Sequence, residues 1–160
     1  MDINLIIERT RDIDLINSIL TDDDIFDSIS EDGSKNGDFE PDVNDELWVK
    51  IECGNDLIGV CNFHHTNKIT IQGHIHILKQ YRREHSLSAA NNIYNWLLSN
   101  SDFLKLIVEI PSCHVNVMKY CKAIGFALEG INRESYLKGG KALDQALLGI
   151  TRQEIEEFLK

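Results

Sequence analysis

A glycine-punctuated stretch near the C-terminal end, residues 110–152, most constrains the fold of this chain. An amphipathic segment stops at Gly125, and an extended apolar run begins at once with Phe126. Glycine directly after a helix can take the left-handed conformation that turns the chain sharply. The pair Gly139-Gly140 then separates two extended runs, as in a tight hairpin. The stretch therefore predicts a short helix followed directly by a β-hairpin.

Apolar periodicity along the whole chain predicts about seven strands and several helices. The predicted strands are residues 4–9, 47–53, 56–64, 68–78, 104–110, 126–136 and 142–150. Helices are predicted to begin at Thr10 or Asp12, at Ser86 or Ser88, ahead of the Gly125 stop, and at the capping box Thr151-x-x-Glu154. We expect one domain spanning residues 1–160, with a mixed sheet flanked by helices.

The charge of the chain limits its partners. The formal net charge is −10. Nucleic-acid binding depends on Lys and Arg side chains that neutralise phosphates, so this balance argues against it. No apolar run is long enough to span a bilayer, which argues against a membrane partner. The acidic and polar N-terminal residues lack the pattern of a signal peptide, and we expect a cytoplasmic protein, in its own cell or in a host cell.

Acidic residues are concentrated between Thr21 and Glu46. Ile25, Phe26 and Ile29 predict one or two helical turns inside this segment, and the rest is typical of a mobile acidic loop. One hypothesis is that the segment attracts a cationic ligand. The alternative is a solvated, disordered loop that serves solubility alone.

The four cysteines form no metal-binding pattern. Cys53, Cys61, Cys113 and Cys121 include no C-x-x-C pair. In a cytosolic protein, isolated cysteines of this kind are typically reduced and buried. We expect neither disulfides nor a structural metal site.

The C-terminal pattern and the order of predicted elements resemble the GNAT superfamily of acyl-CoA-dependent N-acyltransferases. In that family a helix ends in Gly-Phe and a hairpin follows, often with an acidic residue on its return strand. The matching residues here are Gly125-Phe126, Glu129-Gly130, Gly139-Gly140 and Asp144. The resemblance implies an α/β (α+β) fold with a mixed, mostly antiparallel sheet of about seven strands flanked by helices.

The resemblance also implies a site for the co-substrate acetyl-CoA. In the family, the strand before the long helix bonds the pantetheine, and a glycine-rich loop after it holds the diphosphate on backbone N–H groups. The matching stretch here contains no glycine, so Arg82 and Arg83 would have to compensate by ion pairing. The coenzyme contacts that the resemblance implies are Ile77, Leu78, Lys79, Arg82, Arg83, His85, Ser86, Leu87, Ser88, His114 and Asn116. The alternative is an ordinary strand–loop–helix connection with a surface arginine pair.

In many family members, a tyrosine four residues before the glycine of the Gly-Phe pair serves as the acid of the reaction. That position is Cys121 here, with Tyr120 beside it. Adjacent helix residues point about 100° apart, so Tyr120 is not a simple substitute. Cys121 is either a weak proton donor to the leaving thiolate or a core residue.

Two histidines are candidates for the general base. His74 and His76 are spaced i, i+2 in a predicted strand, so both rings project from one face. A neutral imidazole suits proton abstraction near pH 7. The alternatives are hydrogen bonding within the sheet and a zinc site, for which a third ligand is not evident. Glu52, in a neighbouring strand, is a further base candidate.

Three functional hypotheses follow from the sequence. The first is an N-acyltransferase that moves an acetyl group from acetyl-CoA to a primary amine of a cationic small molecule or protein. The second is a GNAT-fold binding or accessory protein, for instance one encoded by a virus, that has lost acyl transfer. The third is a structural subunit that forms a homodimer through the final hairpin.

Overall fold

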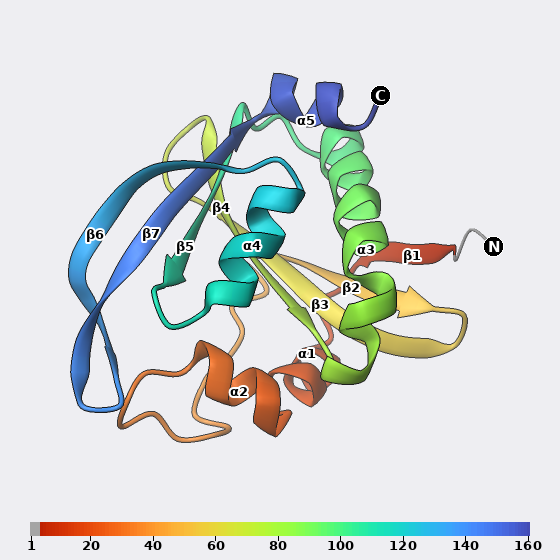
Figure 1. The fold of residues 1–160 in the computed structure, drawn as a ribbon. Coiled ribbons are helices and arrows are strands. Elements are labelled where there is room, and N and C mark those ends of the chain that lie inside the picture. Colours follow the sequence, from red (N-terminus) through yellow and green to blue (C-terminus); the bar gives the residue numbers. More distant parts are fainter. Residues whose placement is uncertain (1–3) are drawn as a thin grey trace.

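The computed structural model describes residues 4–160, and in that range all strands join one sheet (Figure 1). The strands are β1 (Leu5–Arg9), β2 (Leu47–Cys53), β3 (Asp56–His65), β4 (Thr70–Ile77), β5 (Lys105–Pro111), β6 (Ala127–Lys138) and β7 (Lys141–Thr151). Their order across the sheet is β1-β2-β3-β4-β5-β7-β6. The β4–β5 pair is parallel and the other five pairs are antiparallel. The predicted mixed, mostly antiparallel sheet is therefore confirmed.

Glycines form the tight turns at the predicted positions. Gly54 has a φ of 61° in the turn between β2 and β3. Gly139 and Gly140 have φ values of 62° and 72° and connect β6 directly to β7. A two-residue hairpin with two positive φ angles matches the right-handed twist of its strands. Gly125, with a φ of 101°, turns the chain from α4 into β6 as predicted.

Helices cover both faces of the sheet. The helices are α1 (Ile13–Leu20), α2 (Asp23–Ile29), α3 (Lys79–Asn100), α4 (Val115–Ala123) and α5 (Arg152–Phe158). One core lies between the sheet and α3, α4 and α5, where Ile93, Cys121 and Ile155 meet the strands. A second core packs α1 and α2 against Trp48 and Val60 on the opposite face. The sheet therefore separates the molecule into an α3–α4 side and an α1–α2 side.

The start of α3 differs from the prediction. The helix begins at Lys79, directly after β4, and not at Ser86 or Ser88. The physical reason is that the buried stripe of α3 extends back through His85, which is 5% exposed. Because histidine is polar, apolar periodicity alone does not register this turn. No loop therefore separates β4 from the helix.

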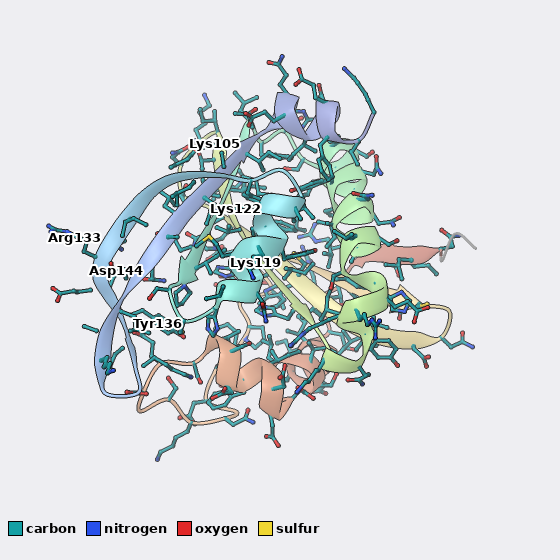
Figure 2. All side chains as sticks on the ribbon, in the orientation of Figure 1. Lys105, Lys119, Lys122, Arg133, Tyr136 and Asp144 are labelled. Atoms are coloured by element: carbon teal, nitrogen blue, oxygen red, sulfur yellow. The ribbon has the colours of Figure 1, made fainter. Side chains whose placement is uncertain are left out.

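The acidic segment is held in place rather than free. The Asp32 carboxylate accepts hydrogen bonds from the N–H groups of Gly139 and Gly140 at the hairpin tip, at 2.9 and 2.7 Å. The Leu137 N–H donates to Glu31 Oε1 at 2.8 Å. Figure 2 shows Tyr136 on β6, near the tip of this hairpin. The sequence gives no sign of these bonds, which join residues about a hundred positions apart.

Candidate active site

The strands β4 and β5 part after three residue pairs. The paired residues are Thr70, Ile71 and Gln72 with Lys105, Leu106 and Ile107. Beyond Gln72, within residues 4–160, β4 pairs only with β3 and β5 only with β7. Figure 1 shows the two strands diverging, β4 toward the start of α3 and β5 toward the start of α4. This divergence leaves a gap in the hydrogen bonding of the sheet.

Backbone groups of β4 point into this gap at alternate residues. The N–H group of Leu78 donates to the carbonyl of Ile58 in β3 at 2.9 Å, so Leu78 faces away from the gap. The N–H and C=O groups of successive strand residues point to opposite neighbours. Those of Gly73, Ile75 and Ile77 therefore face the gap. They can bond an extended amide chain such as pantetheine, although the Ile77 carbonyl already accepts a hydrogen bond from Arg82 Nε. The backbone N–H of Leu78 cannot, because it is bonded to β3.

An apolar cavity of about 60 Å³ lies on the α3–α4 side of the gap. Its lining includes Gly73 and Ile75 of β4, Val108 of β5 and Cys121 of α4. A Cβ at Gly73 would approach the Phe63 ring to 3.0 Å, so the glycine allows this ring to pack closely against β4. The cavity gives the gap a small apolar extension toward the helices.

Cationic side chains stand at the first turn of α3. Arg82 Nε donates to the carbonyl of Ile77 at 2.8 Å, and its Nη2 lies 2.5 Å from Asp24 Oδ2 of α2. Lys79 Nζ lies 4.0 Å from Asp24 Oδ1. Arg83 is exposed and forms no ion pair with the described residues. The first-turn N–H groups of a helix lack partners within the helix and favour an anion.

The next turns of α3 contradict the predicted phosphate loop. His85, Ser86, Leu87 and Ser88 lie in the second and third turns, where backbone N–H groups bond within the helix. His85 is buried with its ring 5.9 Å from that of Tyr81. The Ser86 carbonyl accepts a hydrogen bond from the Tyr120 hydroxyl. These four residues therefore do not form a backbone cradle for a diphosphate.

The gap thus fits one part of acetyl-CoA better than the other. The unpaired backbone of β4 and the apolar cavity suit pantetheine. The cations that could hold a diphosphate at this end of the gap are Lys79, Arg83 and an Arg82 released from Asp24. Any coenzyme binding therefore depends on side-chain cations, in place of a glycine loop.

Three histidines stack on the α1–α2 side of the sheet. The ring centroids of His64 and His74 are 5.9 Å apart, and those of His74 and His76 are 6.5 Å apart. The predicted shared face of His74 and His76 is confirmed. The sequence does not predict that His64 joins these rings. His64 lies beside His74 only because the β3–β4 register places Asn62 opposite His74. Across residues 4–160, no three His, Cys, Asp or Glu side chains are placed to hold a metal ion.

Burial keeps two of these imidazoles neutral. Burial lowers the pKa of His74, and nearby His64 lowers it further. Burial, with smaller effects of His74 and Arg82, lowers the pKa of His76 to about 3. His64 Nδ1 lies 4.0 Å from Glu46 Oε1, which also reaches toward this row of rings. His74 and His76 therefore present uncharged nitrogen lone pairs at neutral pH.

The remaining predicted catalytic residues lie in different places. Glu52 forms an ion pair with Lys50 at 3.0 Å in β2, two strands away from β4, so the structure does not bring it to the histidines. Tyr120 and Cys121 of α4 both line the cavity. Burial raises the pKa of the Cys121 thiol to about 11, and burial also raises the pKa of Tyr120. Both groups therefore keep their protons at neutral pH.

The two predicted coenzyme contacts outside β4 and α3 lie at the start of α4. His114 is the N-cap residue, and its Nε2 atom is buried without a hydrogen-bond partner among the described residues. Asn116 is exposed in the first turn. Their contact with a coenzyme stays a prediction.

The strand order, the parting of β4 and β5, and the helix that follows β4 define the GNAT fold. Within this fold, residues 6–160 match the family described as "Protein of unknown function (DUF2824)", and the chain belongs to that family. No curated protein sequence matches the chain.

Solved structures of polyamine acetyltransferases share the fold. Spermidine N-acetyltransferase from Vibrio cholerae in complex with CoA and spermine has a TM-score of 0.79 and 15% identity, over 95% of this chain and 98% of that one. A mutant form of the spermidine/spermine N-acetyltransferase SpeG from the same organism has a TM-score of 0.78 and 14% identity, over 98% of both chains. SpeG in complex with manganese ions has a TM-score of 0.74 and 14% identity, over 98% of this chain and 97% of that one. At these identities the likeness establishes the fold.

No helix in the described part of the chain is both long and apolar enough to cross a membrane.

Proposed function

We propose that this chain is an acetyl-CoA-dependent N-acetyltransferase that acts on a primary amine of a cationic small molecule or protein. We place this activity in one domain and in the cytoplasm, of its own cell or of a host. The observation that carries the proposal is the gap between β4 and β5, with its unpaired backbone beside the neutral imidazoles of His74 and His76. A solved structure of the same fold contains CoA and spermine, which supports the choice of ligands.

The chain supplies the groups that acetyl transfer requires. The backbone of Ile75 and Ile77 would bond the pantetheine amides and direct the thioester into the gap. As the amine nitrogen attacks the thioester carbonyl, the neutral imidazole of His74 takes the proton that the nitrogen loses. The leaving thiolate takes a proton from the Tyr120 hydroxyl, or from the Cys121 thiol. Each of these groups borders the gap or its cavity.

The acceptor would approach from the α1–α2 side of the sheet. The histidine row and most of the acidic segment lie there, with α1 and α2 packed on the same face. Carboxylates raise the local concentration of a cation and hold it by charge. A polyamine or a lysine side chain fits this environment.

The test is an acetyl-transfer assay with acetyl-CoA and spermidine, monitored by release of free thiol. We expect turnover in the wild type, and at least a tenfold to hundredfold lower kcat in His74→Gln, because general-base catalysis contributes that much or more. His65→Gln removes an exposed histidine of β3 and serves as the matched control. Binding of acetyl-CoA without acetyl transfer to any amine would overturn the proposal.

A GNAT-fold binding protein without catalysis is the second candidate. The specific observation in its favour is the start of α3 at Lys79, which removes the diphosphate loop and leaves Arg82 paired with Asp24. Calorimetric titration with CoA discriminates between the two candidates. Binding supports the enzyme, whereas no heat at millimolar CoA supports the binding protein.

A further inference from the structure

The ion pair between Asp24 and Arg82 joins the two sides of the candidate site. Arg82 belongs to α3, and its Nε is bonded to the Ile77 carbonyl at the mouth of the gap. Asp24 belongs to α2, in the acidic segment on the histidine side. Asp24 Oδ2 is buried and lies 2.5 Å from Arg82 Nη2, without the alignment of a hydrogen bond to any described residue. The contact is therefore a short ion pair that joins α2 to α3.

The Asp24 carboxylate takes the position that a bound anion would need. It lies against Arg82 and within 4.0 Å of Lys79, two of the three cations at the start of α3. A diphosphate that approached this turn would meet an arginine already neutralised and a carboxylate that repels it. A cationic amine that approached Asp24 would meet a carboxylate already paired.

We infer that the Asp24–Arg82 pair is an internal latch that couples the binding of an anionic coenzyme to the binding of a cationic acceptor. A diphosphate that takes Arg82 leaves Asp24 free for the amine. An amine that takes Asp24 leaves Arg82 free for the diphosphate. Both ligands favour the same opened pair, so each strengthens the other by the same factor. The identities of the two ligands rest on the proposed function; the latch itself rests on the ion pair.

The pair is weak enough for ligands to open. The Arg82 and Asp24 side chains are 41% and 36% exposed, and solvent screens a pair of that kind. Releasing such a pair changes an affinity by about two- to fivefold. A diphosphate carries more charge than one carboxylate and can displace it.

Titration with inorganic pyrophosphate at low salt tests the latch without the rest of the coenzyme. Asp24→Asn keeps the shape of the side chain and removes its charge, and we expect pyrophosphate to bind it about two- to fivefold more tightly than the wild type. Asp23→Asn is the matched control, because Asp23 is exposed in the same helical turn and makes no ion pair with the described residues. The gain should vanish in Asp24→Asn combined with Arg82→Gln. Equal affinity in the wild type and Asp24→Asn, or an equal gain in Asp23→Asn, would overturn the latch.

Paired calorimetric titrations of CoA, with and without spermidine, test the coupling. We expect spermidine to strengthen CoA binding in the wild type and to have little effect in Asp24→Asn. Undiminished coupling in Asp24→Asn would overturn the latch and leave the proposed enzyme standing. Loss of coupling in that variant, together with no acetyl transfer by the wild type, would support the latch and overturn the enzyme.

Discussion

Gly125 adopts a backbone conformation that residues with a side chain rarely take. Its φ is 101°, and a Cβ there would lie 3.0 Å from Ile150 Cδ1. We expect Gly125→Ala to lower the free energy of unfolding by about 1–3 kcal/mol through backbone strain. Urea denaturation followed by circular dichroism measures this change.

Gly130 provides the matched control for Gly125. It lies in β6 with open space around the Cβ position and no positive φ. Gly130→Ala should leave stability unchanged or raise it by up to about 1 kcal/mol, because alanine restricts the unfolded chain. Equal losses in the two variants would show that the turn at Gly125 does not require glycine.

His76 should make the fold sensitive to acid. Its pKa of about 3 lies below the ordinary histidine value near 6.5 because the ring is buried. The unfolded chain therefore binds the proton first, so the contribution of His76 to stability is complete above pH 6.5 and is lost as the pH falls toward 3. Between pH 7 and pH 3, the free energy of unfolding should fall less steeply for His76→Gln than for the wild type, by up to about 1.4 kcal/mol per pH unit.

The exposed His65 is the reference for that measurement. His65→Gln measures what the replacement of an exposed histidine alone does to the slope. An unchanged slope in His76→Gln would mean that the imidazole is hydrated in the folded protein. The comparison uses the slopes of unfolding free energy against pH, because each substitution also changes the stability itself at every pH.

At the scale of elements, the tip of the β6–β7 hairpin clamps the end of α2 and the residues after it. Lys138 Nζ donates to the backbone oxygens of Asp27 and Ser30, at 2.6 and 2.7 Å. The N–H groups of Gly140 and Gly139 hold the pKa of Asp32 below its ordinary value. The clamp therefore contributes stability above the ordinary aspartate pKa, and that contribution is lost as the pH falls through the lowered one.

Asp32→Asn should open this clamp locally. An amide oxygen accepts hydrogen bonds more weakly than a carboxylate, so we expect faster hydrogen exchange at the amides of Gly139 and Gly140. Asp38→Asn is the control, because Asp38 is exposed and its carboxylate makes no hydrogen bond with the described residues. Unchanged exchange in Asp32→Asn would show that Lys138 and the Glu31–Leu137 hydrogen bond hold the tip without the Asp32 carboxylate.

Elements whose signals are local could be predicted from the sequence. Gly125 and the pair Gly139-Gly140 mark turns through their own backbone freedom, and the predicted hairpin follows from them. The capping box at Thr151 and Glu154 likewise marks the start of α5. The start of α3 could not be predicted, because the inward-facing residues of its early turns are Tyr81 and the polar His85, and serine N-cap signals lie further along.

Contacts that depend on strand register or on distant segments could not be predicted from the sequence. The i, i+2 spacing predicts the shared face of His74 and His76, whereas His64 joins them only through the β3–β4 register. The pairing of Arg82 with Asp24 joins two helices 58 positions apart in sequence, and no local pattern indicates it. The sequence therefore predicts the strand of the site better than its charge contacts.

The charge of the whole molecule is unevenly distributed. Fifteen of the 26 acidic residues but only three of the 16 basic residues lie in residues 1–46. Figure 2 shows Lys119 and Lys122 on α4 and Arg133 on β6, away from α1 and α2. Like charges crowded in one region repel one another. Salt screens this repulsion beyond the Debye length, which is about 30 Å at 0.01 M and about 8 Å at 0.15 M.

Salt should therefore stabilise the protein, and neutralising part of the acidic region should remove much of that effect. We expect the wild-type Tm to rise between about 0.01 M and 0.15 M NaCl, where the Debye length shortens most. The variant Asp14→Asn, Asp23→Asn, Asp38→Asn should unfold about 2–4 °C higher at low salt and respond less to added salt. The matched variant Asp56→Asn, Asp102→Asn, Glu134→Gln changes the net charge equally but removes exposed carboxylates outside the acidic region. An equal change in the salt response of the two variants would mean that total charge, and not its concentration beside α1 and α2, sets the response to salt.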